Sequence, residues 1–294
     1  LAFACCVSCA YSSCITTSTG CNPTGTAACP TLTVSATAST ISAAIASCSR
    51  SGGGSVTLAR GIFHISEAIV GTGIRNVHLR GQGGSGNANA GGTEFLLTAV
   101  TNTFSFTNAS NIKVSGISVD MQRQPYTYGR AVAVSNDSMT VQFNTTEYPF
   151  PSPLPSSSYL SKVQSVTNYD AANGRPSASA VDLYLTSDPV AVTTVAGDTI
   201  TIPIGTSNSG NIKTGDMYVL RHEVYGRNGY DATRCTNMTV DDVTLFSTPG
   251  MKMSFLILSI YVSQWLLYET TFNMERGPED RRDKPVYSSV SQQD

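Results

Sequence analysis

Two adjacent carboxylates, Asp241 and Asp242, are the residues of this chain whose types and spacing most directly suggest catalysis. Hydrolysis of a glycosidic bond uses two carboxyl groups, one to protonate the leaving oxygen and one to activate water or to attack the sugar. We therefore take both residues as candidate catalytic groups. The competing interpretation is a corner of the chain, where an aspartate bonds nearby backbone groups and has no chemical role.

A second group of ionisable residues, Arg221, His222 and Glu223, follows an apolar strand. Alternation along an extended chain places Arg221 and Glu223 on one face and His222 on the other. An arginine that points outward can hold a sugar hydroxyl or a carboxylate. Arg221 and Glu223 are therefore candidate substrate-binding residues, and an ion pair that bridges two parts of the fold is the alternative.

Asp120, Arg123 and Tyr126 form a third candidate group at the end of another strand. Aromatic rings beside a few polar groups are typical of ligand sites, and they suit the two faces of a sugar ring. The same residues are equally well explained as parts of a turn, so the group is a candidate substrate-binding site with a structural alternative.

The chain contains none of the short motifs that mark metalloproteases, phosphate-binding loops, nucleophile elbows or dinucleotide sites. Its cysteines lack a CxxC pair and a neighbouring histidine, which argues against a zinc site. His64 and His78 lie within alternating strands, where we expect ordinary structural histidines. The sequence therefore predicts no metal site and no cofactor.

The charge of the chain also excludes some partners. Only 13% of its 294 residues are charged, the net charge is −2, and the body of the chain has no cluster of Lys and Arg. Nucleic-acid binding is therefore not expected. Ser, Thr, Asn and Gly supply the polarity instead, which suits a β-rich protein with many turns.

The first 38 residues and the N-glycosylation sequons point to secretion. Residues 1–10 are apolar and end in small residues, like the end of a signal peptide, although a buried first strand is the alternative. Residues 11–38 are rich in Cys, Thr and Gly. Four cysteines lie close together in the sequence, namely Cys14, Cys21, Cys29 and Cys48. They could form two disulfides, which would leave Cys235 unpaired. Sequons occur at Asn108, Asn136, Asn144 and Asn237.

A short helix is expected over 39–48, because its apolar residues recur at the i, i+3, i+4, i+7 spacing of one helix face. These residues are Ile41, Ala44, Ile45 and Cys48. Ser39 or Thr40 can cap the start of this helix, and the three glycines over 52–54 end it.

The strands that follow the helix repeat one another. Residues 111–120 have the layout of 237–246, with an Asn, an alternating strand, a two-residue polar step and a second strand, and 76–81 repeat the first half. Such repetition marks a solenoid, in which stacked coils bury a continuous core and a terminal helix serves as a cap. Further short strands are expected over 55–58, 61–65, 93–97 and 103–106. A two-layer sandwich would instead favour tight hairpin turns, which are scarce.

Two parts of the chain depart from this repeat. Residues 130–217 contain strands joined by turns, which predict an inserted antiparallel β-domain between coils over 39–129 and resumed coils over 218–252. Residues 253–294 change character, because an apolar run over 255–268 precedes a charged stretch. That run is shorter than the roughly 20 residues of a membrane helix. A membrane anchor, a core helix or cap, and a tail foreign to the fold remain open alternatives.

Residues 40–81 resemble the opening of pectin-lyase-like β-helix proteins, with a Gly-rich turn and strand over 51–58, GIFHI at 61–65 and LRGQG at 79–83. More narrowly, residues 110–251 are similar to the exo-acting α-1,3-galactosidase family of glycoside hydrolases, through VLRH at 219–222, VYG at 224–226 and CTNMTVDDVTLFSTPGM at 235–251. In that family the coils continue well past this last element, so its catalytic carboxylates cannot be placed here. The further motifs that accompany the Asp pair of polygalacturonases are missing.

The resemblance implies an all-β protein with a right-handed parallel β-helix, an N-terminal capping helix and an inserted antiparallel β-domain. It implies a secreted, carbohydrate-active protein, which we expect to be monomeric, to bind a polysaccharide or other glycan, and to need neither a cofactor nor a membrane. A glycoside hydrolase acting on galactosides is the first hypothesis. A non-catalytic glycan-binding or structural β-helix is the alternative, and a lyase is less favoured because no cluster of Ca²⁺-holding acids is evident.

Overall fold

A computed structural model describes residues 29–83, 91–170, 175–176, 182–184, 190–206, 208–223, 227–247 and 253–267 of the chain. The described residues are mostly β-structure with a single α-helix. They divide into two compact units. The first unit includes the residues up to Asp120, Asn228–Phe246 and the strand after residue 252, and the second includes Met121–Arg227.

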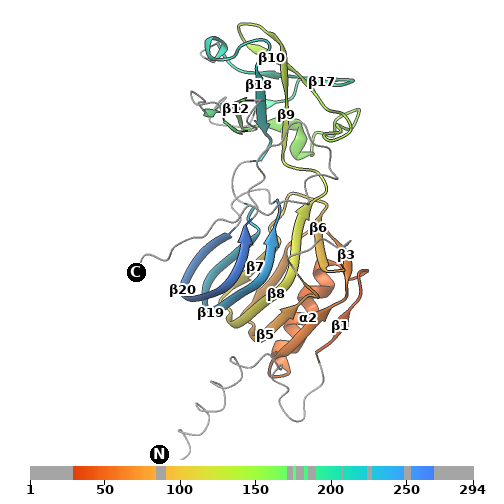
Figure 1. Cartoon of the computed structure of the whole chain (residues 1–294), viewed down its shortest axis with the longest axis vertical. Coiled ribbons are helices and arrows are strands. Elements are labelled where there is room, and N and C mark those ends of the chain that lie inside the picture. Colours follow the sequence, from red (N-terminus) through yellow and green to blue (C-terminus); the bar gives the residue numbers. More distant parts are fainter. Residues whose placement is uncertain are drawn as a thin grey trace, which may run out of the picture. The chain divides into compact units, whose positions relative to one another are not determined.

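The first unit is built on a large curled sheet of ten strands, and every strand pairing recorded in it is parallel (Figure 1). Its strands are β1 (Thr31–Leu32), β2 (Gly54–Leu58), β3 (Gly61–Ile65), β4 (Ile69–Thr72), β5 (Arg75–Arg80), β6 (Thr93–Leu97), β7 (Phe104–Thr107), β8 (Ser110–Met121), β19 (Tyr230–Leu245) and β20 (Met253–Leu267). The positions of β2, β3 and β5 to β8 follow the strands expected from the sequence closely, whereas β4 was not expected.

The pairings fall into three parallel ladders, and each strand pairs with its counterpart one repeat later. One ladder joins β2, β5, the start of β8 and the middle of β19. A second joins β4, β7 and the start of β19. A third joins β3 to β6, and the end of β8 to the end of β19. The long strands β8 and β19 therefore pass from one ladder to the next at corners.

The corners use left-handed backbone conformations at equivalent positions. Gly116 has φ 68° and Asp242 has φ 48°, and the strand register pairs the residues just before them, Ser115 and Asp241. The expected coincidence of Asp241-Asp242 with Ser115-Gly116 is thereby confirmed. Glycine, asparagine and aspartate are the residues that adopt this conformation most readily.

A second corner carries a stack of asparagines. Asn76, Asn111 and Asn237 all have φ between 52° and 57°. Asn111 Nδ2 donates to Asn76 Oδ1 at 2.8 Å, and Asn237 Nδ2 donates to Asn111 Oδ1 at 2.7 Å. Gly53 stands next to this stack, where a Cβ atom would lie 2.3 Å from the Asn76 carbonyl oxygen. Its two hydrogen bonds join residues 35 and 126 positions apart in the chain.

The core of the first unit contains a cluster of aromatic rings from successive repeats. Phe63 contacts Phe95, and Phe95 contacts Phe104, with ring centroids 5.7 and 5.8 Å apart. Phe104 and Phe106 both contact Tyr230 at 5.6 Å. All five side chains are at most 1% exposed. Burial of such rings is a large hydrophobic contribution, and the cluster joins β3, β6, β7 and β19.

The helix α2 (Ala38–Arg50) packs its apolar face against the start of the sheet. Its buried residues are Ala38, Ile41, Ala44, Ile45 and Cys48, which include the four expected from the spacing. Two of its serines accept hydrogen bonds from strand N–H groups, Ser42 from Val70 and Ser49 from Arg75, both at 2.8 Å. The helix therefore satisfies part of a strand edge.

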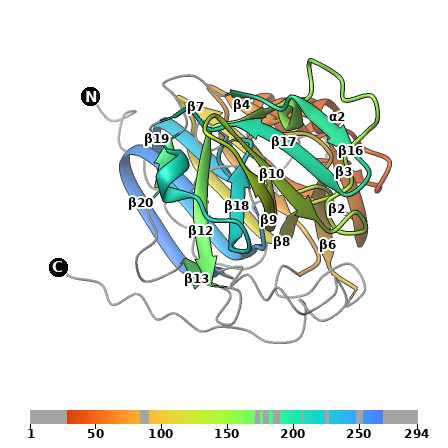
Figure 2. The same ribbon diagram turned by 90° about the horizontal axis from the view of Figure 1, so that it is seen from above.

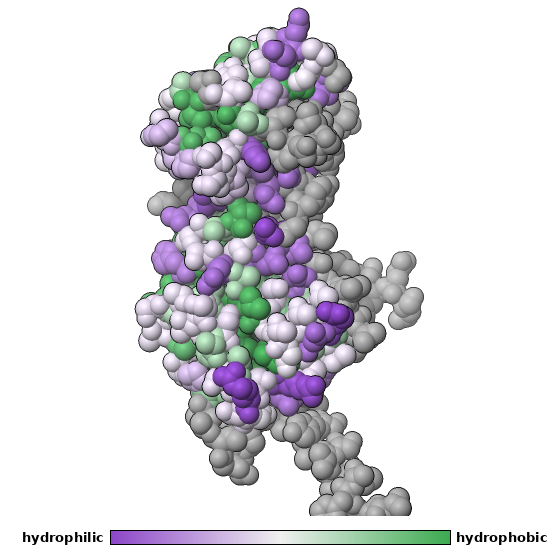
Figure 3. Space-filling model, turned by 180° about the vertical axis from the view of Figure 1, so that it is seen from behind, coloured by the Kyte–Doolittle hydropathy of each residue, from purple (hydrophilic) through white to green (hydrophobic). Residues whose placement is uncertain are grey.

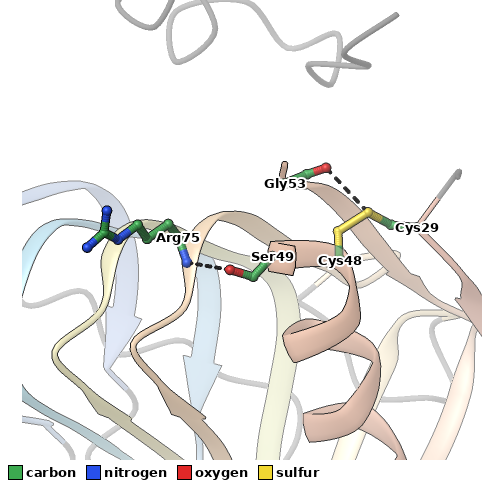
Figure 4. Close-up of a disulfide and its surroundings, with 5 residues drawn as sticks. All are labelled: Cys29, Cys48, Ser49, Gly53 and Arg75. Atoms are coloured by element: carbon green, nitrogen blue, oxygen red, sulfur yellow. Dashed lines mark hydrogen bonds between the residues drawn. A yellow bond between two sulfur atoms is a disulfide. The ribbon is translucent and has the colours of Figure 1, made fainter. Parts of the chain in front are cut away.

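The start of this helix differs from the expectation. The N-cap is Thr37, not Ser39 or Thr40, because the Thr37 hydroxyl accepts the backbone N–H of Thr40 at 3.2 Å. A disulfide joins Cys29 to Cys48 at the end of the helix (Figure 4). Cys235 is free and buried, as expected. Cys14 and Cys21 lie outside the described residues.

The second unit contains an antiparallel sheet of eight strands (Figure 2). They are β9 (Tyr126–Val134), β10 (Ser138–Phe143), β12 (Ser165–Asp170), β13 (Arg175–Pro176), β14 (Asp182–Tyr184), β16 (Thr194–Ala196), β17 (Thr199–Pro203) and β18 (Met217–Arg221). The strands β11 (Lys162–Val163) and β15 (Val190–Ala191) form a separate pair. Two short 3₁₀ turns are η2 (Tyr159–Ser161) and η3 (Ser209–Asn211).

The end of this unit corrects one expectation. The sequence predicts that the parallel coils resume at 218, but β18 pairs antiparallel with both β9 and β12. Parallel pairing with the strands of the first unit resumes instead at β19, from Tyr230. The alternating apolar pattern of β18 suits either kind of sheet, so it does not reveal the partner strand. The insertion likewise starts earlier than 130, because β9 begins at Tyr126.

The structure of the apolar run over 255–268 also differs from what the sequence suggested. It is neither a core helix nor a tail detached from the fold, because β20 pairs parallel with β19 from Tyr230 to Leu245. The physical reason for this pairing is the edge of β19, whose backbone N–H and C=O groups need hydrogen-bond partners. Residues 268–294 lie outside the described residues. Within the part of the chain that the structure describes, no helix is long and apolar enough to cross a membrane.

Candidate functional site

The strands of the first ladder present two rows of polar side chains on their outer face. Their alternate residues are buried in the core, namely Val56, Leu58, Val77, Leu79, Ile112, Val114, Met238 and Val240. The outer residues stand in register in two rows, Ser55, His78, Lys113 and Thr239 in one, and Thr57, Arg80, Ser115 and Asp241 in the other. We call these eight residues the outer polar rows.

Two contacts within the rows run diagonally from one strand to the next. Lys113 Nζ lies 2.8 Å from Asp241 Oδ2. His78 Nε2 lies 2.7 Å from Ser115 Oγ. In both cases a residue of the first row reaches the second row on the following strand, a separation that long side chains span. Ser115 therefore has His78 bonded to its hydroxyl, and it pairs in register with Arg80 and Asp241.

The surroundings of His78 favour its neutral form. Burial first, and then the positive charges of Lys113 and Arg80, lower its pKa from 6.5 to about 4, although Asp241 opposes the shift. At neutral pH the imidazole is therefore uncharged, and its Nε2 can either accept a proton or donate one. The sequence suggested an ordinary strand histidine here, and it gave no reason to single out Lys113 or Ser115. Aligning the repeats in register and listing their outward residues would have found all three.

The two candidate catalytic carboxylates differ in position. Asp241 lies on the outer face, paired with Lys113, and its side chain is 30% exposed. Asp242 lies at the corner, exposed and with φ 48°. The corner interpretation therefore describes Asp242, whereas Asp241 belongs to the outer polar rows.

The candidate binding residue Arg123 lies in the second unit, where its guanidinium N–H groups donate hydrogen bonds to residues of its own loop. Its Nη1 donates to the carbonyl oxygens of Gln124 and Tyr126, and its Nη2 donates to Thr127 Oγ1 at 2.8 Å. Its guanidinium carbon lies 4.9 Å from the centre of the Tyr148 ring. Burial lowers its pKa from the ordinary value. These contacts fasten the loop, and cation–π attraction keeps the charge among aromatic rings.

The same loop holds His222 in one tautomer. His222 Nδ1 lies 2.7 Å from the carbonyl oxygen of Lys162 and must donate to it. Its Nε2 then accepts the hydroxyl of Thr127 at 2.8 Å, while Thr127 accepts from Arg123. Burial first, and then the charge of Arg123, lower the pKa of His222 from 6.5 to about 3, although the bond to Lys162 opposes the shift. His222 is therefore a neutral, buried, fully bonded side chain.

The remaining candidates lie around this loop or in the other unit. The Tyr126 ring packs against Tyr148 with centroids 5.8 Å apart. Arg221, at the end of β18, is half-buried and pairs in backbone register with Tyr126. Glu223 is half-buried, and its backbone N–H donates to the Pro125 carbonyl oxygen. The last candidate, Asp120, is half-buried near the end of β8 and belongs to the first unit.

No group of three or more His, Cys, Asp or Glu side chains that could hold a metal ion occurs within the described ranges. Comparison with known protein families finds no family model that matches the chain, and no curated protein matches it either. The chemical case therefore rests on the geometry of the residues themselves, and the outer polar rows are the described surface that brings charged and hydroxyl groups together most regularly.

Proposed function

We propose that this chain is part of a secreted, carbohydrate-active protein of the pectin-lyase-like type, with its coils wound as a right-handed parallel β-helix. The three parallel ladders, the left-handed corners and the asparagine stack support this proposal. In the proposed arrangement each repeat is one coil, α2 caps the first coil, and the second unit is an insertion between the third and fourth coils.

The outer polar rows are the proposed polysaccharide-binding surface, and they carry the functional argument. Successive strands are roughly 4.8 Å apart, so four strands present repeating polar groups over roughly 14 Å. A ligand with hydroxyl groups at regular intervals can bond to donors and acceptors set out in this way. The rows offer both kinds, because Lys113 and Arg80 donate, Asp241 accepts, and the Ser and Thr hydroxyls do either.

Hydrolysis of galactosides is the second candidate function, and the outward position of Asp241 favours it. Inverting enzymes place two carboxyl groups roughly 6.5–9.5 Å apart, and retaining enzymes place them about 5–5.5 Å apart. Asp241 is the single carboxylate among the eight residues of the rows. Binding therefore has the firmer support from the described residues, and a hydrolase needs a second acid from elsewhere in the protein.

Binding is tested by isothermal titration of the protein with soluble galactans and with uronic-acid polymers. We expect Lys113→Gln to weaken binding about tenfold or more, since it removes a cation and releases Asp241. The matched control is Ser105→Ala, which changes an outward residue of β7 on a different ladder and leaves binding unchanged. Folded protein that binds neither class of polymer contradicts the proposal.

Hydrolysis is tested separately by measuring release of galactose or of reducing ends from the same polymers. The second candidate expects turnover that Asp241→Asn lowers at least about 100-fold, the usual size of a general acid–base contribution. Binding without turnover rejects the hydrolase and keeps the binding function.

A further inference from the structure

Ser115 and His78 have the geometry of a nucleophile and its base. The Oγ–Nε2 distance is 2.7 Å, within the range that direct proton transfer requires. The two side chains come from neighbouring strands, β8 and β5, whose registered pairing fixes their separation. Ser115 directly precedes the left-handed corner at Gly116, where β8 passes from one ladder to the next.

The groups around this pair suit a reaction that develops negative charge. Arg80 pairs in register with Ser115, is exposed, and makes no side-chain hydrogen bond or ion pair to another described residue. Lys113 lies two positions before Ser115 on the same face, and its side chain is 39% exposed. Cations beside a nucleophile stabilise an oxyanion that forms there.

The chemistry of the pair is acyl transfer. Cleavage of a glycosidic bond passes through an oxocarbenium-like state that carboxylates stabilise, and a serine hydroxyl does not replace them. An alkoxide leaves an ester far more readily than an amine leaves an amide. The pair has no carboxylate bonded to His78 among the described residues, so it suits the more reactive of the two acyl compounds, an ester.

We propose that Ser115 and His78 remove small acyl groups, of the size of acetyl, from O-acylated polysaccharide bound along the outer polar rows. The choice of a polysaccharide rests on the proposed function. The choice of a small acyl group follows from Ser115 itself, which is only 8% exposed. An acyl group as compact as acetyl suits a hydroxyl with so little exposed surface.

The reaction balances in two steps. Ser115 Oγ attacks the ester carbonyl carbon while its proton passes to His78 Nε2, and the resulting oxyanion faces Arg80 and Lys113. The carbon–oxygen bond to the sugar then breaks, and the sugar oxygen takes the proton from His78. Water next attacks the acyl–Ser115 ester, gives a proton to His78, and the acid leaves as Ser115 regains its hydroxyl proton.

The test uses a small fluorophosphonate, which labels activated serines, together with hydrolysis of p-nitrophenyl acetate. We expect mass spectrometry to place the label on Ser115, and Ser115→Ala to abolish labelling and to lower hydrolysis at least about 100-fold. His78→Gln keeps a hydrogen-bonding group beside Ser115 but no base, and it lowers the rate similarly. The matched control is Ser105→Ala, which removes an outward hydroxyl of β7 on a different ladder and leaves the rate unchanged.

Two further measurements separate a catalytic role from a structural one. The rate should stay constant as pH falls through 6.5 and should decline only near pH 4, where His78 becomes protonated. Acetyl esters should react faster than butyryl esters. Labelling at another residue, or a Ser115→Ala protein that keeps its rate, overturns the inference.

The same preparations distinguish this inference from the proposed function. Protein that binds polysaccharide but shows neither label nor ester hydrolysis rejects the acyl-transfer pair and leaves the binding surface in place. Protein that hydrolyses p-nitrophenyl acetate at Ser115 but binds no polysaccharide rejects the proposed substrate and keeps the pair.

Discussion

At the scale of single residues, the two histidines with lowered pKa values have different roles. His222 is 2% exposed and both of its ring nitrogens are bonded, so it holds a loop and is closed to substrate. His78 bonds to Ser115 through its Nε2 and stands on an outer face. The same direction of pKa shift therefore accompanies a structural residue in one unit and a candidate base in the other.

His222 predicts a loss of stability in acid. Its pKa is about 3 in the folded protein and 6.5 when unfolded, so between these pH values the unfolded chain binds a proton that the folded chain does not bind. The stabilisation is complete above about pH 6.5 and is lost as pH falls toward 3, at up to roughly 1.4 kcal/mol per pH unit. Urea unfolding at pH 7.5, 5.5 and 4.0 measures this slope.

The control for this prediction is a pair of variants. His222→Gln keeps groups for both hydrogen bonds but does not titrate, so its stability should fall less between pH 7.5 and 4.0 than that of the parent protein. His64→Gln changes an exposed strand histidine and should leave the slope unchanged. Parallel slopes for the parent and His222→Gln would contradict the assignment.

At the scale of elements, the corners determine how strands are joined. The asparagine stack combines a backbone requirement with a bonding requirement, because each member adopts a left-handed conformation and its amide bonds to the next repeat. Helix α2 meets a related need at the start of the sheet, where Ser42 and Ser49 bond strand N–H groups. Side chains thus provide partners where strand pairing alone leaves backbone or corner groups unmatched.

The asparagine stack predicts a graded response to substitution at Asn111. Asn111→Ala removes both amide bonds, each worth about 1 kcal/mol, and puts at φ 55° a residue that tolerates the left-handed conformation less well than asparagine does, which adds up to about 1 kcal/mol. We expect a loss of about 2–3 kcal/mol in the free energy of unfolding. Asn111→Gly loses the same two bonds, but glycine adopts the left-handed conformation without strain, so this variant should be less destabilising. Equilibrium urea unfolding measures both variants. Equal effects of the two variants would show that the left-handed conformation at residue 111 makes no contribution to the loss.

At the scale of the whole molecule, weakly polar residues dominate much of the surface. Pale residues cover much of the face in Figure 3, with small apolar areas between them. The large apolar side chains that are exposed among the described residues are Val34, Ile62, Val70 and Val132. This surface agrees with a chain in which only 13% of residues are charged, because Ser, Thr and Asn supply its polarity.

The strand β20 predicts how the first unit responds to shortening of the chain. A protein that ends at residue 252 exposes the whole edge of β19, from Tyr230 to Leu245. An unpaired edge is a template for association with other chains. We expect a lower melting temperature and concentration-dependent aggregation, measured by calorimetry and light scattering against the full chain. Identical melting and solubility would show that β20 adds nothing to the fold.

The residue pattern alone determined much of the first unit. Alternation of apolar and polar residues located β2, β3 and β5 to β8 but missed β4, and the repeat placed Asp241-Asp242 at the corner of Ser115-Gly116, because these features depend on neighbours a few residues apart. The apolar spacing of α2 likewise identified its buried face. Each of these is a local property, and local geometry fixes which side of an element faces the core.

Tertiary structure decided which strands pair and therefore which side chains meet. Strand β18 alternates like a strand of the coils but joins the antiparallel sheet, and the apolar run after residue 252 extends along β19. The contact between His78 and Ser115 spans 37 residues and that between Asn111 and Asn237 spans 126. Pairing depends on partners far along the chain, and alternation specifies the face of a residue without specifying the strand beside it.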